Sequence, residues 1–320
     1  MPLRPELLPR RWRQQFARRR GARRDRLDER GQRRQWFLLT GRRPRLDPAQ
    51  LDVAGLTPLY PPLDQFWADP FVWRRDGQSC CFFEARAYRI KRGHIRAWPL
   101  DPDGRPIGES FPVIDRPHHL SYPFVLEHEG GLYMIPESAE TGRVELYGCV
   151  RFPDRWELIR PLIQGRRLSD CTLLRHDGRW WLFCAGSQGR SRVNETLLAF
   201  HADDPLGERW IPHAGNPILR DFGGARPAGR IQQDAAGRLL RPAQDCIRRY
   251  GYGLSLNRIT ALSPERYAEQ RIWYGNGPAI GGWRGLHHLD WHDGLLVMDA
   301  QRLIPAGTDP GPPARGRRTA

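Results

Sequence analysis

Five segments of the chain repeat one pattern of apolar and polar positions. Each has an apolar run, a tight turn that ends in glycine, and a second apolar run, as in ADPFVWRRDGQSCCFFE from Ala68. Three of the turns are Asp-Gly dipeptides, which favour a type I′ turn because that turn needs positive φ at both central positions. The pattern predicts five β-hairpins about 50 residues apart, with turn glycines Gly77, Gly130, Gly178, Gly237 and Gly294.

A third apolar run follows each of the first four hairpins, and a fourth run follows some of them. Each unit therefore has the pattern of a four-stranded antiparallel sheet, and five such units arranged radially make a β-propeller. A β-sandwich with similar hairpins is the alternative, but sandwiches do not repeat at a fixed period. We predict an all-β, five-bladed β-propeller over residues 66–303.

The basic charge of the chain is concentrated at its N-terminus. The net charge is +15, and residues 1–48 hold 16 Arg against five Asp or Glu. This uneven distribution argues against a nucleic-acid-binding propeller. We expect residues 1–48 to be a disordered basic arm, which is either upstream sequence translated from an early start codon or a segment that touches anionic lipid, nucleic acid or a partner. Residues 49–65 are expected to be a Pro-rich lead-in, and residues 304–320 a disordered tail.

Membrane spans and secretion are not indicated. No stretch approaches the roughly 18–20 consecutive apolar residues of a membrane span, and the N-terminus lacks the apolar core of a secretory signal. The six cysteines form no CxxC pair and, apart from Cys246, lie in strand-like apolar runs, which indicates reduced, buried thiols. We therefore expect a cytoplasmic protein that lies at the inner face of the membrane wherever its basic arm contacts lipid.

Strand register predicts where the polar residues of the hairpins gather. With the turn at positions −1 and 0, residue −8 pairs with residue +7, and paired side chains share a face. The predicted pairs are Asp69 with Glu84, Tyr122 with Glu137, Asp170 with Ala185, and Gly229 with Gln244. These hairpin ends share one rim of a propeller. The mouth of the central channel should therefore receive Asp69, Glu84, Glu137, Asp170 and Gln244, with His287 and His288 arriving from the fifth repeat.

Two carboxylates directly opposite each other, as predicted for Asp69 and Glu84, destabilise a sheet unless something compensates. One compensation is a basic partner from the fourth repeat, which carries Arg226, Arg230 and Arg241. The other is a split of the two pKa values, with one group ionised and the other protonated. Such a split supplies the base and the acid that hydrolysis of a glycosidic bond needs.

Aromatic and hydrogen-bonding side chains accompany these carboxylates, and the mixture suits the apolar C–H faces and the hydroxyls of sugar rings. The set comprises Trp67, His119, Tyr122, Gln244, Tyr250, Tyr252 and Trp283. The histidines lack the helical i, i+4 spacing of a known zinc motif. We therefore predict neither a metal nor a cofactor.

Residues 67–71 (WADPF) and 82–84 (FFE) resemble the first blade of the five-bladed arabinanase/β-xylosidase/invertase-type propellers. Residues 119–137 (HLSYPFVLEHEGGLYMIPE) and 226–252 (RPAG…LLRPAQDC…RYGYG) resemble one branch, the N-terminal-type domain of glucosamine inositolphosphorylceramide transferases. This domain is also found beside bacterial formyltransferase-like domains. The resemblance covers roughly residues 60–303 and implies the five-bladed fold. In the plant-type transferases a separate domain is the expected transferase.

The resemblance to the hydrolases implies roles for two carboxylates. Their first-blade Asp is the general base, a position that Asp69 matches. Their third-blade Asp, matched by Asp170, tunes pKa values and stabilises the transition state. Their general acid is a Glu that opens the fourth blade, where this chain reads ARPAG at 225–229. The carboxyl groups available to replace this acid are Glu84, Glu137 and Asp245. Alternatively, the arginines mark a pocket for an anionic sugar or a phosphate.

Three functions are compatible with these observations. The first is an enzyme that acts on a glycosidic bond, by hydrolysis or transfer, in surface polysaccharide or glycolipid metabolism. The second is a non-catalytic saccharide-recognition domain with a glycosyltransferase or formyltransferase partner, and the third is a protein-interaction propeller. We favour the first, with a neutral or anionic saccharide or glycolipid as substrate. The predicted catalytic residues are Asp69, Asp170 and Glu137. The predicted substrate-binding residues are Glu84, His119, Tyr122, Arg226, Arg241, Gln244, Asp245, Tyr250, His287 and His288.

Overall fold

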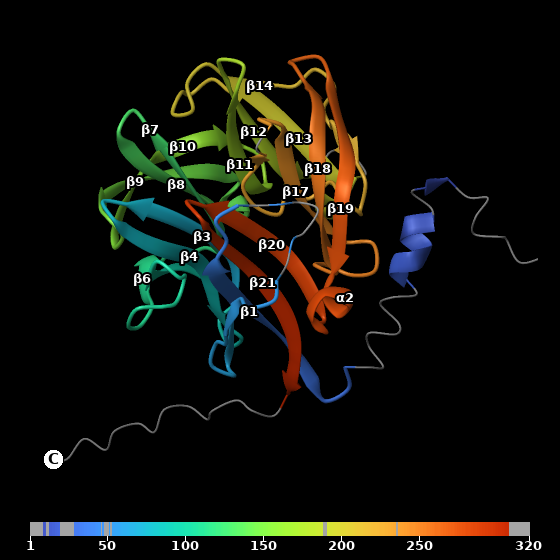
Figure 1. The fold of residues 1–320 in the computed structure, drawn as a ribbon. Coiled ribbons are helices and arrows are strands. Elements are labelled where there is room, and N and C mark those ends of the chain that lie inside the picture. The colour runs from blue at the N-terminus through green and yellow to red at the C-terminus, as the bar shows by residue number, and fades with distance from the viewer. Residues whose placement is uncertain are drawn as a thin grey trace, which may run out of the picture.

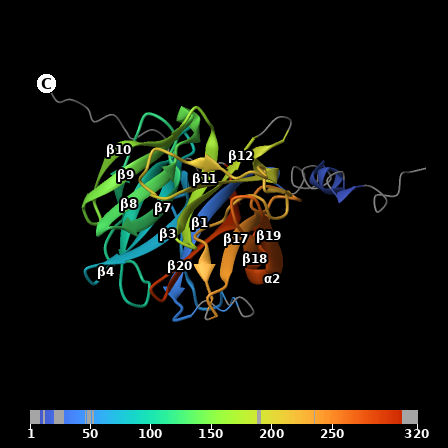
Figure 2. The same ribbon diagram turned by 90° about the horizontal axis from the view of Figure 1, so that it is seen from above.

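The computed structural model describes residues 9–10, 13–19, 29–45, 47, 51, 53–187, 191–234 and 236–306. Its strands form five antiparallel sheets arranged around one centre, as Figure 1 and, from above, Figure 2 show. The predicted five-bladed β-propeller is thus confirmed. We number the blades by the order in which their innermost strands occur in the chain.

Blades one to four each come from one continuous stretch of chain. Blade one contains β3 (Gln65–Arg75), β4 (Gln78–Ala87), β5 (His94–Leu100) and β6 (Phe111–Ile114). Blade two contains β7 (Ser121–His128), β8 (Gly131–Glu137), β9 (Arg143–Arg151) and β10 (Arg155–Gln164). Blade three contains β11 (Leu168–His176), β12 (Arg179–Gly186), β13 (Thr196–Ala202) and β14 (Ile211–Pro212), with β15 (Leu219–Arg220) also paired to β13. Blade four contains β16 (Gln232–Gln233), β17 (Leu239–Asp245), β18 (Gly253–Leu262) and β19 (Tyr267–Asn276).

Short helices occur only in connections within the described part of the chain and at its N-terminal end. They are η3 (Ala139–Thr141), η4 (Val193–Glu195), α2 (Gly277–Gly281) and a helix over residues 13–19. None of the helices in the described ranges is long and apolar enough to span a membrane.

Blade five is built from both ends of the chain. Its order is β2-β1-β21-β20, so β20 (Gly285–His292) and β21 (Leu295–Pro305) are completed by β1 (Gln32–Arg42) and β2 (Thr57–Leu59). This corrects two predictions, the disordered arm over residues 1–48 and the separate lead-in over residues 49–65. The physical reason is the apolar run at 36–39, which is buried although charged residues dominate the composition around it.

Part of the N-terminal helix also contacts the propeller, which further corrects the prediction of a disordered arm. Gln14 donates to the Asp221 carboxylate, and Arg18 donates to the carbonyl of Cys246 while its guanidinium lies over the Phe222 ring. Residues 1–8, 11–12, 20–28, 46 and 48 of the predicted arm lie outside the described residues. The disordered tail was predicted from residue 304, but β21 continues to Pro305, and residues 307–320 lie outside the described residues.

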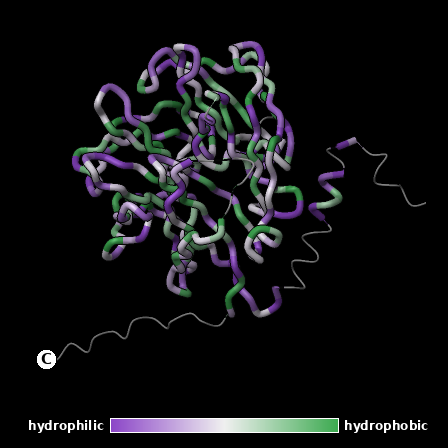
Figure 3. Tube along the Cα trace, viewed as in Figure 1, coloured by the Kyte–Doolittle hydropathy of each residue, from purple (hydrophilic) through white to green (hydrophobic). Residues whose placement is uncertain are grey.

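Five hydrophobic clusters fill the interfaces between neighbouring blades. For example, Leu38 packs with Trp67 and Val72 between blades five and one, while Phe37 and Leu39 on the opposite face of β1 pack between blades five and four. Figure 3 shows the same distribution, with hydrophobic stretches along the strands and hydrophilic loops at the rim. Both faces of a blade are therefore buried, which explains the nearly continuous apolar runs in the sequence.

A bulge recurs on the inner strands of the first three blades. The register skips two residues there, so Ala68, not Asp69, pairs with Glu84, and Ser121 pairs with Glu137. Ser169 likewise pairs with Ala185. The first skipped residue of each bulge has positive φ, namely Asp69 (53°), Tyr122 (45°) and Asp170 (56°). The predicted pairs were thus wrong by one residue, because counting from the turn assumed an unbroken ladder.

The equivalent position of blade four is Gly229, with a φ of 129°. A Cβ atom at this glycine would lie 1.8 Å from the carbonyl oxygen of Leu289, so no other residue fits without a backbone shift. The predicted strand pair between Gly229 and Gln244 does not form, because β17 pairs with an inner strand of only two residues, Gln232–Gln233. The six cysteines carry free thiols, five buried and Cys149 half-buried.

We predict that β1 is required for folding. A chain that begins at Glu29 should unfold cooperatively on heating, whereas a chain that begins at Arg43 should not. Burial of Phe37, Leu38 and Leu39 alone contributes about 5–9 kcal/mol, comparable with the roughly 5–15 kcal/mol stability of a whole domain. Differential scanning calorimetry of both chains measures this. A sharp transition at an unchanged temperature in the shorter chain would show that the ring closes without β1.

Candidate functional site

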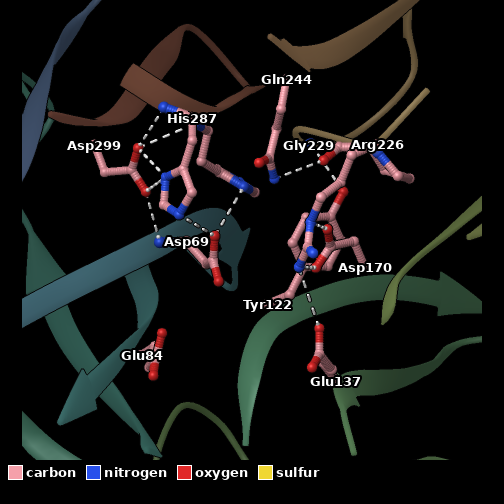
Figure 4. Close-up of polar contacts among 12 residues, drawn as sticks. Asp69, Glu84, Tyr122, Glu137, Asp170, Arg226, Gly229, Gln244, His287 and Asp299 are labelled. Carbon is pink, nitrogen blue, oxygen red and sulfur yellow. Dashed lines mark hydrogen bonds and ion pairs between the residues drawn. The ribbon is translucent and has the colours of Figure 1, made fainter. Parts of the chain in front are cut away.

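A polar pocket lies at the ends of the inner strands that are far from the hairpin turns. It encloses about 190 Å³. Its walls include seven residues that the sequence analysis assigned to the site: Asp69, Glu84, His119, Glu137, Arg226, Tyr250 and His287. Figure 4 shows the polar contacts among the central residues. Of the side chains expected to gather at the mouth of the channel, Asp69, Glu84, Glu137 and His287 line this pocket, whereas Asp170, Gln244 and His288 do not.

Asp69 is held at the pocket wall by the bulge of β3. Its backbone N–H donates to the Asp299 carboxylate at 2.9 Å, and its Oδ1 lies 3.6 Å from Nε2 of His287 and 3.7 Å from Nδ1 of His288. Burial raises the pKa of Asp69 to about 7, and the neighbouring carboxylates of Asp170 and Asp299 add to the rise while the charge on His287 opposes it. Asp69 can therefore gain or lose a proton near neutral pH.

Glu84 and Glu137 line the same pocket from β4 and β8. Burial raises the pKa of Glu137 to about 8, with a further rise from Asp170 and an opposing effect of Arg226, whose Nη2 lies 3.8 Å from the carboxyl group. Burial also raises the pKa of Glu84 well above its usual value, helped by the charge of Asp69. Both groups therefore carry a proton at neutral pH and can donate it.

His119 stands beside Glu84, with Nε2 3.7 Å from Oε1. Its Nδ1 accepts a hydrogen bond from the backbone N–H of Gly93 at 2.8 Å. Burial, together with the charge of Arg86, lowers the pKa of His119 to about 4. At neutral pH the ring is uncharged, so Nε2 carries the single ring proton and lies near Glu84, beyond hydrogen-bond distance.

Asp170 does not face the pocket as a free carboxylate. Arg226 holds it with two hydrogen bonds, from Nε at 2.6 Å and from Nη2 at 3.2 Å, and donates a third to Asn194. The guanidinium also lies 5.1 Å from the centre of the Tyr250 ring. Arg226 thus sits at the opening of the fourth blade, where the resemblance to the hydrolases implied a glutamic acid, and it neutralises the third-blade carboxylate.

The expected basic partner for Asp69 is a histidine, not an arginine of the fourth repeat. Arg230 pairs with Asp290 at 3.0 Å, and Arg241 pairs with Glu269 at 2.7 Å. Glu84 is not directly opposite Asp69 either, because of the bulge. Asp69 and Glu84 therefore do not repel each other as two anions, because Glu84 is protonated and His287 lies close to Asp69.

Five predicted binding residues lie outside the pocket walls. Arg241 is fully buried in its pair with Glu269, and Asp245 accepts from the Ile247 N–H and the Tyr274 hydroxyl, so their assignment to the site was wrong. Gln244 donates to the Pro227 carbonyl beneath the pocket. The buried side chains of Tyr122 and His288 form a layer behind it, with the Tyr122 hydroxyl bonded to Thr172 and to the N–H of Gly229, and the two rings in edge contact.

Sequence reasoning missed three residues that shape the site. Trp36 lines the pocket from β1 and stacks on the His287 ring with centroids 4.0 Å apart. Arg86 also lines the pocket, and Asp299 lies behind it on β21. Trp36 lies in the stretch that was predicted to be a disordered arm. Asp299 could have been found from the sequence, because a single carboxylate inside the apolar run LLVMDA indicates a buried polar residue.

One group of potential metal ligands occurs among the described residues. Single ligand atoms of Asp69, His287 and Asp299 lie within 4.8 Å of one another. However, Asp299 already accepts hydrogen bonds from the N–H groups of Asp69, His287 and His288 and from the His287 ring. Three of these donors reach Oδ1 and one reaches Oδ2, so the carboxylate already accepts four hydrogen bonds from the protein.

The five antiparallel blades and the carboxyl-lined pocket at one mouth define a five-bladed β-propeller with a polar central site. A family model described as "Glucosamine inositolphosphorylceramide transferase 1, N-terminal" matches residues 58–295. The chain belongs to this family.

Curated relatives agree with that assignment, and a solved structure shares the fold. The chain is 34% identical over 258 residues to glucosamine inositolphosphorylceramide transferase 1 of Oryza sativa subsp. japonica, covering 76% of this chain and 34% of the relative. It is 33% identical to the Arabidopsis thaliana protein of the same name, covering 70% and 30%. The chain thus spans about a third of these relatives. Zg3597, a family 117 glycoside hydrolase of the marine bacterium Zobellia galactanivorans, shares the fold with a TM-score of 0.53 and 12% identity, over 83% of this chain and 90% of that one.

We predict that the Asp170–Arg226 pair stabilises the fold strongly. Arg226→Gln leaves a carboxylate with a 2% exposed side chain unpaired, and this should cost about 3–5 kcal/mol of unfolding free energy. The double variant with Asp170→Asn should lose less than the sum of the two single changes. Urea denaturation measures these values. Arg238→Gln, which breaks the exposed pair with Asp234, is the control and should cost under about 1 kcal/mol. Additive losses in the double variant would contradict the pairing.

Proposed function

We propose that this propeller binds a saccharide in the central pocket and acts on a glycosidic bond, with Asp69 as base and Glu137 as acid. The observation that carries the proposal is the pair of buried carboxyl groups in one pocket with pKa values of about 7 and about 8. Between these values Asp69 is ionised while Glu137 keeps its proton. A base and an acid are then present together, as glycosidic chemistry needs.

In this mechanism the proton movements balance. The Asp69 carboxylate takes a proton from water or from the hydroxyl of an acceptor sugar. The oxygen of that water or hydroxyl attacks the anomeric carbon at the same time. The bond from that carbon to the leaving oxygen breaks with its electron pair on the oxygen, which takes the proton of Glu137. Water as the attacking group gives hydrolysis, and a sugar hydroxyl gives transfer.

Two further features support a saccharide as the ligand. Trp36 and Tyr250 give the pocket an aromatic wall, which suits the C–H faces of a sugar ring. Arg86 and Arg226 also line it and favour an anionic group on the ligand. The names of the plant relatives refer to glucosamine and to an inositol phosphate lipid. Glycans that carry an amino sugar or a phosphorylated inositol are therefore the first ligands to test.

Arg226 favours a second candidate function, a saccharide-recognition domain without catalysis. It occupies the place where the resemblance implied the acid, and it neutralises Asp170. The relatives are about three times as long as the matched region, which leaves room for a catalytic domain elsewhere. In this case the propeller would bind the glycan for a glycosyltransferase or formyltransferase partner.

We predict that Asp69→Asn separates the two functions. If the propeller is an enzyme, this change keeps the shape of the side chain, removes the base and lowers turnover by about 10²–10⁴-fold. The experiment screens the full chain against a glycan library for binding and for released or transferred product. Asp293→Asn, an exposed carboxylate at a hairpin turn, is the control and should leave both readouts unchanged. Unchanged glycan binding without turnover in either form would establish the recognition function instead.

We also predict a narrow pH optimum for the activity. Turnover should rise as the pH passes about 7, where Asp69 becomes ionised, and fall as it passes about 8, where Glu137 loses its proton. Initial rates between pH 5 and 10 measure the profile. Glu137→Gln should remove the alkaline limb along with most of the activity, and a limb that persists in this variant would assign the acid to another group.

A further inference from the structure

His287 lies between two buried carboxylates. On one side, its Nδ1 is 2.7 Å from the Asp299 carboxylate. On the other side, its Nε2 is 3.6 Å from Oδ1 of Asp69. Its side chain is 3% exposed and lines the pocket. The ring plane is fixed by Trp36, stacked at 4.0 Å and 15°, and by Tyr250, in edge contact at 5.2 Å.

Asp299 determines which ring nitrogen faces the pocket. Its oxygens accept the backbone N–H groups of His287, His288 and Asp69, so the carboxylate is surrounded by donors. Burial works against its charge, but the charge of His287 and these hydrogen bonds lower the pKa of Asp299. A carboxylate that stays ionised only accepts hydrogen bonds, so Nδ1 of His287 must be its donor. Nε2 then faces Asp69.

His287 is the cation that Asp69 needs. Burial alone would lower the pKa of His287, but the charges of Asp299 and Asp69 raise it. The other nearby cation, Arg226, is bound to Asp170. Oδ1 of Asp69 is buried and has no hydrogen-bond partner among the described residues. At 3.6 Å, His287 attracts this oxygen by charge and leaves its lone pairs free to accept a proton.

Other ionisable groups face Asp69 from every neighbouring element. They are His288 on β20, Asp170 on β11, Glu84 on β4, Glu137 on β8, Tyr122 on β7, and Tyr250 and Arg226 in the loops of blade four. His288 is uncharged, since burial lowers its pKa to about 3, and the glutamic acids and tyrosines are protonated at neutral pH. Among the charged neighbours of Asp69, His287 therefore favours its ionised form most, and Asp170 and Asp299 oppose ionisation.

We propose that Asp299, His287 and Asp69 form one relay, in which Asp299 holds the His287 ring so that its Nε2–H keeps Asp69 ionised as the base. Asp299 and His287 are positioning residues in this relay. The inference rests on the proposed role of Asp69, and it adds the two residues that make this carboxylate a base in a pocket lined by two other carboxyl groups, Glu84 and Glu137.

The test measures protonation directly, without the need for a substrate. Nuclear magnetic resonance of the ¹⁵N-labelled imidazoles and ¹³C-labelled aspartate carboxyls follows the full chain through a pH titration. The signals are assigned by their loss in His287→Gln and Asp69→Asn. In the unmodified protein, Nδ1 of His287 should stay protonated throughout, and the Asp69 carboxyl should titrate near pH 7.

The variants distinguish the relay from a merely structural role. His287→Gln should move the Asp69 midpoint upward by about 1–3 pH units, because a cation within reach of the carboxylate is lost. Asp299→Asn should raise it less and should lower the pH at which the His287 ring loses its proton, because the charge of Asp299 that favours the protonated ring is lost. His176→Gln, beside a distant hairpin turn, is the matched control and should change neither signal.

An unchanged Asp69 midpoint in folded His287→Gln, or a neutral His287 ring at the pH where Asp69 titrates, would overturn the relay. If Asp299→Asn fails to fold, His287→Gln still decides the question. The proposed function fails separately, since a chain that processes no glycan can still show the titrations expected of the relay. The reverse result is glycan turnover by the unmodified protein together with the same Asp69 midpoint in His287→Gln. This result would refute the relay and leave the proposed function standing.

Discussion

The pairing of β1 with β21 closes the ring, and the rest of the structure depends on this closure. The ladder runs without a break from Gln32 opposite Pro305 to Arg42 opposite Leu295. It joins two segments of chain that are more than 250 residues apart. β21 contributes Asp299 and β1 contributes Trp36, so the two sides of the His287 ring are assembled in the same step as the fifth blade. The pocket therefore cannot form before the ring is closed, and any change that weakens the ladder weakens the site.

A second constraint is the bulge near the end of the inner strand in blades one, two, three and five. In an unbroken ladder, a residue at this place would point to one face of its blade. The left-handed backbone at Asp69, Tyr122 and Asp170 instead turns these side chains toward the centre. A non-glycine residue at positive φ is strained by about 1–3 kcal/mol, so other contacts must hold it. At Asp69 these contacts include the hydrogen bond from its N–H to Asp299, which binds blade one to blade five.

The sequence was sufficient to predict the fold and the end of the propeller at which the polar residues gather, because both follow from the spacing of turns and apolar runs. It was insufficient for β1, since the buried run at 36–39 is short and lies among arginines that dominated the charge count. Register counting placed Asp69 opposite Glu84, and only coordinates reveal a bulge that moves the pairing by one residue. The partners of Arg241 and Asp245 could not be predicted either, because both partners, Glu269 and Tyr274, lie on β19, which packs outside the inner hairpin.

The charges at the pocket explain why so many carboxyl groups can be buried together. Asp170 is matched by Arg226, and Asp299 is matched by His287 and by backbone N–H groups, so each of these two carboxylates has its own donors. Glu84 and Glu137 have only more distant partners, His119 at 3.7 Å and Arg226 at 3.8 Å, and their burial raises both pKa values and keeps them protonated. Asp69 is neither fully paired nor left without a charged neighbour, since His287 lies near it but also pairs with Asp299. A ligand that displaces water from the pocket, or brings its own charge, will therefore change the protonation of Asp69 first.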